Sequence, residues 1–193
     1  DLAVVDHYGL ARDYEAGLRD WAGTVAVIDD LADRPHDCDL LADPSPGRMV
    51  ADYQKLVAPH CRVLTGPSYA LLRPEFAQQR PHSLSRRKGA HEPCRILVSF
   101  GMTDPGNLTV AALRALDKAR FIHMVDVVLG GSAPHLDDVH NAIANSGLDV
   151  RLHINATDMA ELMAAADVSI GGSGGSALER CCLGLPSISI SAA

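Results

Sequence analysis

The sequence is short of aromatic residues and of positive charge. Aromatic side chains make up 4% of the 193 residues, and the formal net charge is −7 at pH 7. A surface that binds nucleic acid is normally basic, and single strands stack on aromatic side chains. The nine histidines are scattered along the chain and are mostly neutral at pH 7. Together these deficits argue against a nucleic-acid partner.

Long apolar runs and paired cysteine motifs are missing as well. No run is long enough to span a bilayer, and no signal peptide opens the chain. The five cysteines include no C-x-x-C pair, which favours reduced thiols over zinc ligands or disulfides. With 47% hydrophobic residues, the chain can still bury a sizeable core. We therefore expect a cytoplasmic protein without membrane insertion, as a monomer or weak dimer.

Both ends of the chain lie inside apolar runs. The sequence begins at Leu2-Ala-Val-Val5 without a start methionine and stops within Ser187-Ile-Ser-Ile190. Strands that start and stop without flanking turns lead us to expect a piece of a longer protein.

Short β-type runs alternate with helical patterns, which is typical of an α/β protein with parallel sheets. After Pro93 the alternation is regular and predicts five parallel strands with four crossover helices. The segment 78–93 is polar, basic and rich in residues that break helices. This composition predicts a linker in which the basic run at 86–88 is exposed to solvent. We therefore expect a partial α/β domain over 1–77, a linker over 78–93 and a second α/β domain over 94–193.

The most informative stretch is the turn Gly171-Gly-Ser-Gly-Gly175, which follows an apolar strand and opens a short helix. Glycines let a ligand approach the backbone closely, and the first N–H groups of a helix have no internal partner. The helix dipole also favours negative charge at this point. Glu179, one turn into the helix, can accept hydrogen bonds from sugar hydroxyls. A ligand that contains both a phosphate and a ribose is a nucleotide, so the turn and Glu179 together predict a nucleotide site.

Three other interpretations of this turn are possible. A G-x-S-x-G nucleophile elbow at Ser173 needs a later acid and histidine, but no histidine follows Gly175. A dinucleotide fingerprint needs G-x-G-x-x-G and a distant acidic residue, and the spacing here is wrong. The third interpretation is an ordinary strand-to-helix turn that binds no ligand, and the residues alone do not exclude it.

Two further loops are predicted at the same sheet edge, where doubly wound sheets bind ligands. The first follows Ser99 and contains Gly101 and Thr103, and Asn107 is placed to cap the next helix. The second follows His153, and Thr157 or Asp158 is placed to cap its helix. Each loop alone reads as an ordinary connection, but together with the glycine turn they predict one shared site.

These motifs resemble the C-terminal half of GT-B fold nucleotide-sugar enzymes. The resemblance rests on Gly101-x-Thr-Asp104, on Asn155 followed by Met159-Ala-Glu-Leu-Met163, and on Glu179-Arg-Cys-Cys-Leu-Gly-Leu-Pro186. Four earlier segments, in the same order, are similar to the UDP-2,4-diacetamido-2,4,6-trideoxy-β-L-altropyranose hydrolases of pseudaminic acid biosynthesis: Val5–Gly9, Ile28–Ala32, His36–Asp39 and Gly66–Phe76. The resemblance implies a GT-B-like fold of two Rossmann-like domains, the N-terminal one incomplete.

The same resemblance implies a set of binding residues. The diphosphate would lie between two loops, one with Gly101, Met102 and Thr103 and the other with Ser173, Gly174, Gly175 and Ser176. The uracil would lie along the backbone of Asn155 and Ala156, and Glu179 would bind the ribose. The sugar would lie beside Tyr8. Met102 departs from the pattern, since the family often has a second glycine there. From the residues alone, Tyr8 is equally well read as a half-buried aromatic at a strand end.

The activity that the resemblance implies is hydrolysis of the anomeric linkage of a UDP-sugar. Water would attack C1 with inversion, and a histidine would act as general base. That histidine belongs to a glycine-rich loop upstream of Asp1, so we expect no catalytic residue in this chain and no activity from it alone. No metal and no cofactor is implied. A GT-B glycosyltransferase of surface polysaccharide synthesis and a non-catalytic nucleotide-sugar binding module are the alternatives.

Overall fold

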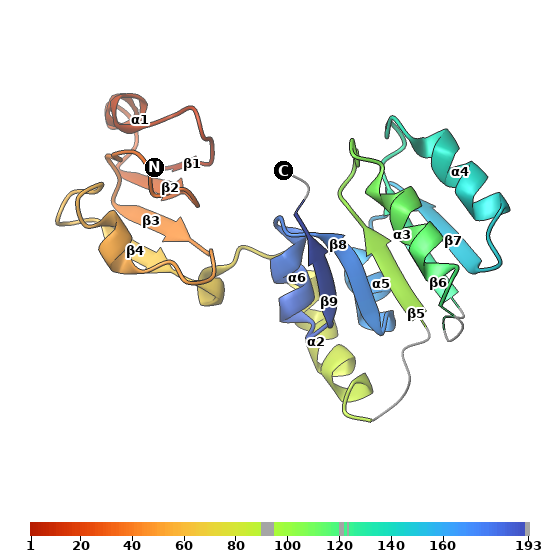
Figure 1. Ribbon diagram of the computed structural model, residues 1–193. Helices are drawn as coiled ribbons and strands as arrows, with labels where there is room; N and C mark the ends of the chain where they lie inside the picture. Colours follow the sequence, from red (N-terminus) through yellow and green to blue (C-terminus); the bar gives the residue numbers. More distant parts are fainter. Residues whose placement is uncertain (90–94, 120–121, 123, 192–193) are drawn as a thin grey trace. The chain divides into compact units, whose positions relative to one another are not determined.

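Two compact units divide the chain in the computed structural model, which describes residues 1–89, 95–119, 122 and 124–191. Unit 1 spans Asp1–Leu71 and unit 2 spans Leu72–Ala193. Unit 1 holds a sheet of four parallel strands, and unit 2 holds a sheet of five (Figure 1). The predicted α/β fold with two parallel sheets is therefore confirmed.

Unit 1 places its strands in the order in which they occur along the chain. Its elements are β1 (Leu2–Val5), α1 (Arg12–Leu18), β2 (Thr24–Ile28), β3 (Leu40–Asp43), the 3₁₀ helix η1 (Val50–Tyr53), β4 (Arg62–Thr65) and the 3₁₀ helix η2 (Pro67–Tyr69). The sheet order is β1-β2-β3-β4, with every pair parallel. Because each crossover steps in the same direction, right-handed connections carry the intervening segments to one face of the sheet.

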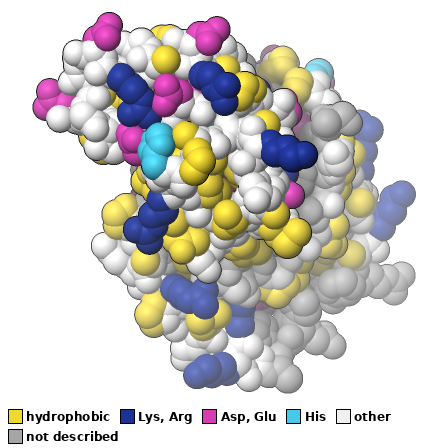
Figure 2. Space-filling view, turned by 90° about the vertical axis from the view of Figure 1, so that its left-hand side faces the viewer, with side chains coloured by type: hydrophobic (Ala, Val, Ile, Leu, Met, Phe, Trp, Pro, Cys, Tyr) yellow, Lys and Arg dark blue, Asp and Glu magenta, His cyan; other side chains and the backbone are white. Residues whose placement is uncertain are grey.

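The side chains of unit 1 alternate between a covered and an open face. Val5, Val27 and Leu41 are buried in a core that includes residues from α1 and η1. Leu2 and Val4, which point the other way, are 61% and 59% exposed. In the space-filling view, acidic and basic side chains lie next to one another on the surface, with hydrophobic side chains gathered below them (Figure 2).

In unit 2 the first three strands add in one direction across the sheet and the last two add in the opposite direction. Its elements are α2 (Pro74–Arg86), β5 (Arg95–Ser99), α3 (Leu108–Leu116), β6 (Met124–Leu129), α4 (Leu136–Ala144), β7 (Asp149–Ile154), α5 (Met159–Ala165), β8 (Val168–Gly172), α6 (Ser176–Cys182) and β9 (Ser187–Ile190). The sheet order is β7-β6-β5-β8-β9, all parallel, which confirms the five strands and four crossovers expected after Pro93. The order turns around between β5 and β8, the kind of switch point where such sheets bind ligands.

Helices cover both faces of the unit 2 sheet. On one face, α3 and α4 pack in a core that includes Val98, Leu113 and Val127. On the other face, a second core joins Leu97 and Val128 of the sheet to Met163 of α5. This two-sided burial explains why β5 carries three consecutive apolar residues, Ile96 to Val98, and why β6 is apolar except for Asp126. No helix in the described part of the chain is long and apolar enough to cross a membrane.

The structure differs from the predicted linker over 78–93. Residues 78–86 belong to α2, and 90–93 lie outside the described residues. Pro74 opens this helix, where a missing N–H is harmless, but Pro81 lies inside it. Packing outweighs that interruption, because Phe76 and Ser83 are fully buried and the Ser83 hydroxyl donates to the Leu183 carbonyl at 2.7 Å. The compact units accordingly divide at 71/72, not around a linker.

The basic run at 86–88 is not the solvated face that its composition predicted. Arg87 donates to the carbonyls of Met163 and Ala166, at 3.0 and 2.7 Å, at the end of α5. Arg86 forms an ion pair with Asp167, which is nearly buried. The two arginines therefore fasten the end of α2 to the connection between α5 and β8.

Candidate functional site

The loops that follow β5 and β8 are neighbours at the carboxyl edge of unit 2. The two strands pair in register, with Ser99 opposite Gly171. A Cβ on Gly171 would lie 2.3 Å from the Ser99 carbonyl oxygen, so only glycine allows the two strands to approach this closely. The loops that contain Gly101 and Ser173 therefore start from paired residues at the same edge of the sheet. The structure therefore brings two of the three predicted loops together.

The turn after β8 presents free backbone donors. Ser173, Gly174 and Gly175 are exposed. Their N–H groups donate no hydrogen bond to any residue that the structure describes, whereas Ala177 already donates to the Gly174 carbonyl. Consecutive unpaired N–H groups form a concave site for an anion. The local geometry therefore suits the phosphate role predicted for this turn.

The loop after β5 has a similar character. Gly101 has a φ of +92°, a conformation that side chains disfavour, and Met102 and Thr103 are exposed. The predicted cap of α3 by Asn107 is wrong, because Asn107 is itself left-handed and makes no capping bond. Asp104 caps the helix instead, accepting from the N–H groups of Leu108 and Thr109 at 3.0 and 2.9 Å. The Asn107 side chain instead donates to Asp138 at 3.1 Å.

A glycine pair after β6 connects this loop to the third one, and the sequence analysis missed it. The Gly130 N–H donates to the Met102 carbonyl at 2.8 Å, and the Gly131 N–H donates to Oδ1 of Asn155 at 3.0 Å. Asn155 has a φ of 54° and uses its own N–H to bond Leu129. The sequence signal that could have indicated this contact is the Gly-Gly pair directly after an apolar strand. Through it the loops after β5, β6 and β7 form one bonded edge, and Ala156 follows directly.

Glu179 lies half-buried on α6. Burial raises the pKa of its carboxyl group, and the nearby Arg73 and Arg180 offset this only in part. Within the described residues its carboxylate accepts no hydrogen bond. A carboxylate without a hydrogen-bond donor beside an anion site is suited to accept bonds from the hydroxyls of a ligand.

Arg180, the next residue, is buried, with 2% of its surface exposed. Its guanidinium donates to the Gly172 carbonyl at 2.6 Å, the Ser176 hydroxyl at 3.1 Å and the Ser189 hydroxyl at 3.5 Å. Sequence reasoning treated this residue only as part of a motif. The sequence signal that could have indicated its burial is its position in the helix, three residues before the buried Leu183 and four residues after Ser176.

Tyr8 lies in unit 1, in the loop after β1. Its ring is 66% exposed, and its hydroxyl donates to Oδ2 of Asp30 at 3.1 Å. This hydrogen bond raises the pKa of the Tyr8 hydroxyl, and the negative charge of Asp30 adds to the effect. An exposed tyrosine held at the carboxyl edge of the sheet is available to a ligand, and it is not the half-buried aromatic that the residues alone also allowed.

Beneath this loop, unit 1 buries three carboxylates. Each has a basic partner: Glu15 with His36 at 2.7 Å, Asp29 with Arg34 at 2.9 Å and Asp43 with Arg48 at 2.5 Å. The Tyr53 hydroxyl lies 2.8 Å from both Asp29 and Asp43. Burial raises the pKa of Tyr53, and its two carboxylate neighbours raise it further. These contacts are internal to unit 1 and fix the ends of β2 and β3.

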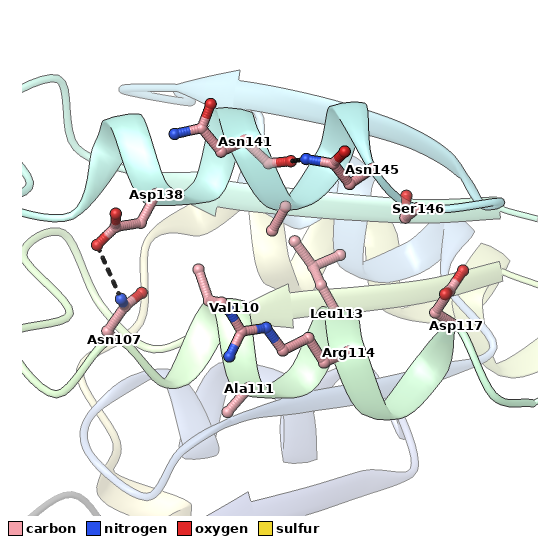
Figure 3. A pocket seen from close by; sticks show the side chains of 11 residues that line it. Asn107, Val110, Ala111, Leu113, Arg114, Asp117, Asp138, Asn141, Asn145 and Ser146 are labelled. Atoms are coloured by element: carbon pink, nitrogen blue, oxygen red, sulfur yellow. Dashed lines mark hydrogen bonds between the residues drawn. The ribbon is translucent and has the colours of Figure 1, made fainter.

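A groove of about 440 Å³ lies elsewhere on unit 2, between α3 and α4 (Figure 3). Val110 and Leu113 lie along it, and Asn107 donates to Asp138 across its end at 3.1 Å. None of the residues predicted to bind a nucleotide lines it. A search of the described residues finds no group of three or more His, Cys, Asp or Glu side chains that could hold a metal ion.

Comparison with known proteins identifies distant relatives. No protein-family model matches the chain. The UDP-2,4-diacetamido-2,4,6-trideoxy-beta-L-altropyranose hydrolase of Campylobacter jejuni is 29% identical over 163 residues, which are 84% of this chain and 56% of that protein. The spore coat polysaccharide biosynthesis protein SpsG of Bacillus subtilis is 32% identical over 133 residues, 67% of this chain and 38% of that protein. The chain thus spans about half the length of the curated relatives it matches.

A solved structure matches at the level of the fold. The crystal structure of Acinetobacter baumannii MurG superposes with a TM-score of 0.53 at 14% identity, over 91% of this chain and 47% of that one. At this identity the likeness concerns the fold alone. It agrees with the GT-B-like fold that the sequence resemblance implied.

Proposed function

We propose that this chain carries the UDP-binding part of a UDP-sugar hydrolase. The whole protein would hydrolyse the anomeric linkage of a UDP-activated 2,4-diacetamido-2,4,6-trideoxy sugar, releasing UDP, in pseudaminic (nonulosonic) acid biosynthesis. The substrate class rests on the distant similarity to the Campylobacter jejuni hydrolase. The observation that carries the proposal is the carboxyl edge of unit 2, where exposed N–H groups donate to no described residue and the helix that follows the turn carries Glu179 in its first turn.

In this proposal the diphosphate lies between the two loops at the switch point. Gly101, Met102 and Thr103 donate from one side, and the turn from Ser173 to Ser176 donates from the other. In support of this proposal, the N–H groups of these residues donate no hydrogen bond to a described residue. Glu179 accepts from the ribose hydroxyls, and uracil lies along the backbone of Asn155 and Ala156.

The chemistry assigned to these residues is stabilisation of the leaving group. As the bond between the sugar C1 and the phosphate oxygen breaks, negative charge grows on the UDP oxygen. Backbone donors already aimed at that position stabilise the charge without rearranging, which lowers the barrier. UDP is therefore able to leave without a strong general acid. From the sequence resemblance, Tyr8 is the residue proposed to contact the sugar, and its side chain is exposed.

The general base of this reaction is proposed to lie outside these residues, in a loop before Asp1. A positioned base contributes about 10²- to 10⁴-fold to the rate, so this chain alone should release almost no UDP from the sugar nucleotide. Comparable turnover by this chain and by a longer protein that includes such a loop would mean that the base lies within residues 1–193.

A glycosyltransferase is the second candidate, and the similarity to SpsG, named for spore coat polysaccharide biosynthesis, favours it. The UDP half of the site serves both reactions equally, so only the attacking group differs. The deciding experiment follows UDP release from the diacetamido sugar nucleotide by the longer protein, with and without sugar acceptors. Release with water alone supports the hydrolase. Release that requires an acceptor supports the transferase, and binding without any release supports a non-catalytic module.

A further inference from the structure

Arg180 is a buried cation that forms no ion pair with a described residue, and the charge of the preceding Glu179 offsets its burial only in part. Within the described residues, no carboxylate lies within ion-pair distance of its guanidinium, and its Nε has no hydrogen-bond partner. The other buried carboxylates of unit 2 are bonded elsewhere: Asp126 pairs with Arg95, Asp167 pairs with Arg86, and Asp104 accepts from the first N–H groups of α3. Burying a charge without a counter-charge is costly, so an unbalanced one requires a reason.

The orientation of its hydrogen bonds supplies that reason. In a trans peptide the C=O and the following N–H point in opposite directions. Because the Gly172 carbonyl points inward at Arg180 at 2.6 Å, the Ser173 N–H points away from the guanidinium. Ser173 is exposed, so this donor faces the outer side of the turn. Donation from a charged group also polarises the peptide, which strengthens the outward N–H.

The Ser176 hydroxyl is prepared in the same way. Its oxygen accepts from Nη1 of Arg180 at 3.1 Å, which leaves the hydroxyl proton free to be donated elsewhere. The space around the guanidinium is narrow, since a Cβ on Gly171 would lie 3.2 Å from Nη1. The cation is thus fixed between the end of β8 and the start of α6.

We propose that Arg180 is a positioning residue for the diphosphate. From beneath the turn it holds the Gly172–Ser173 peptide and the Ser176 hydroxyl as phosphate donors, and its charge is balanced when the phosphate binds. Burial lowers the pKa of Arg180, and the charges of Cys181 and Glu179 offset this only in part. The role rests on the proposed function, because it presupposes that the turn binds a diphosphate.

The test compares UDP with uridine, which lacks the phosphates. Dissociation constants are measured by calorimetry or ligand-observed NMR for the wild-type chain, Arg180→Lys and Arg180→Met. We expect Arg180→Lys to weaken UDP binding about 10-fold and Arg180→Met about 100-fold, with uridine affinity unchanged. Loss of the fold would lower both affinities, so the ratio of UDP to uridine affinity separates positioning from a structural role.

Arg87→Lys is the matched control. Arg87 is also partly buried and held by backbone carbonyls, but it lies at the amino edge of unit 2, away from the turn. This variant should leave the affinity ratio unchanged. If an Arg180 variant does not fold, Ser176→Ala removes the prepared hydroxyl without burying or exposing a charge and should still lower the ratio about 3- to 10-fold.

The outcomes separate the two proposals. Absence of UDP binding by the wild-type chain at millimolar concentration would overturn the proposed function, and the role of Arg180 with it. Normal UDP binding with an unchanged affinity ratio in folded Arg180 and Ser176 variants would overturn the role of Arg180 alone.

Discussion

The two units bury charge at the carboxyl edges of their sheets in opposite ways. In unit 1 the buried Glu15, Asp29 and Asp43 each have a histidine or arginine partner. In unit 2 the buried Arg180 has only uncharged oxygen partners among the described residues. A charge with a partner at ion-pair distance holds loops together, whereas a buried cation with no carboxylate at that distance prepares a site for a ligand of opposite sign. Substitutions in the first region should therefore affect stability, and those in the second should affect binding.

The largest effect is expected from Asp43→Ala in unit 1. The substitution leaves Arg48 only the more distant carboxylate of Asp52, at 4.0 Å. It also removes one of the two carboxylate acceptors of the Tyr53 hydroxyl and the acceptor of the Ser45 N–H. Breaking a buried ion pair from one side costs about 3–5 kcal/mol of unfolding free energy. Urea unfolding, followed by far-UV circular dichroism and by the fluorescence of the single tryptophan, Trp21, measures the loss.

The matched control for this prediction is Asp33→Ala. Asp33 also pairs with an arginine, Arg34 at 3.0 Å, but its side chain is 59% exposed. An exposed ion pair contributes about 0–1 kcal/mol, so the control should unfold nearly like the wild type. UDP affinity should be the same in both variants. A smaller loss for Asp43→Ala than for Asp33→Ala would break the comparison between the units.

A smaller effect is expected from Gly171→Ala in unit 2. Its Cβ would lie 2.3 Å from the Ser99 carbonyl oxygen, so β5 and β8 must move apart. Forced packing of this kind costs about 1–3 kcal/mol. At Gly172 nothing lies within 4 Å of the added atom, so Gly172→Ala is the control and should be close to neutral. Equal urea midpoints for the two variants would show that the strands are not in close contact.

The dependence of stability on pH follows from the paired carboxylates. Burial alone would raise the pKa of Asp43, but hydrogen bonds from Ser45, Tyr53 and Arg48 outweigh it and leave the pKa below its ordinary value. A carboxyl group with a lowered folded pKa stabilises the protein above its unfolded pKa of about 3.9 and loses this contribution as the pH falls towards the folded pKa. The stability difference between the wild type and Asp43→Asn should therefore shrink below about pH 4. A difference that does not change with pH would contradict the assignment.

The smallest change in stability is expected from Glu179→Ala, which should act on binding. Loss of hydrogen bonds between a carboxylate and ribose hydroxyls should weaken UDP binding by about 1–3 kcal/mol. Substitution of a partly exposed helix residue should change stability by less than about 0.5 kcal/mol. Calorimetry with UDP on both proteins measures the first effect and urea unfolding the second. Equal UDP affinities would leave Glu179 as an ordinary charge near the start of α6.

Much of unit 2 follows from local sequence, because buried parallel strands are apolar runs and its crossover helices repeat regularly. The elements over Arg95–Ser99, Met159–Ala165 and Val168–Gly172 lie close to where pattern alone predicts them. The helix over Pro74–Arg86 does not follow from pattern. Its sequence is polar and contains Pro81, and it forms because Phe76 and Ser83 are buried against distant parts of unit 2.

The candidate site was predictable as a set of loops but not as an arrangement of charge. Glycines at Gly101 and Gly171–Gly175 mark where backbone must turn or approach another strand. Whether Arg180 points to solvent or beneath the turn depends on how α6 packs, which the sequence of one helix does not specify. The choice of Asp104 over Asn107 as the cap of α3 likewise depends on the path of the whole loop, in which both residues have a positive φ and Asn107 bonds Asp138 instead.

The most direct test maps UDP onto the chain itself. Backbone amide resonances of the ¹⁵N-labelled protein are followed while UDP is added. We predict that the largest shifts occur at Gly101–Thr103 and Ser173–Ser176, with smaller ones near Asn155 and Ala156, while the amides around Asp29 and Asp43 stay unchanged. Shifts confined to unit 1 or to the groove between α3 and α4, or no shifts at millimolar UDP, would contradict a diphosphate site at this edge of unit 2.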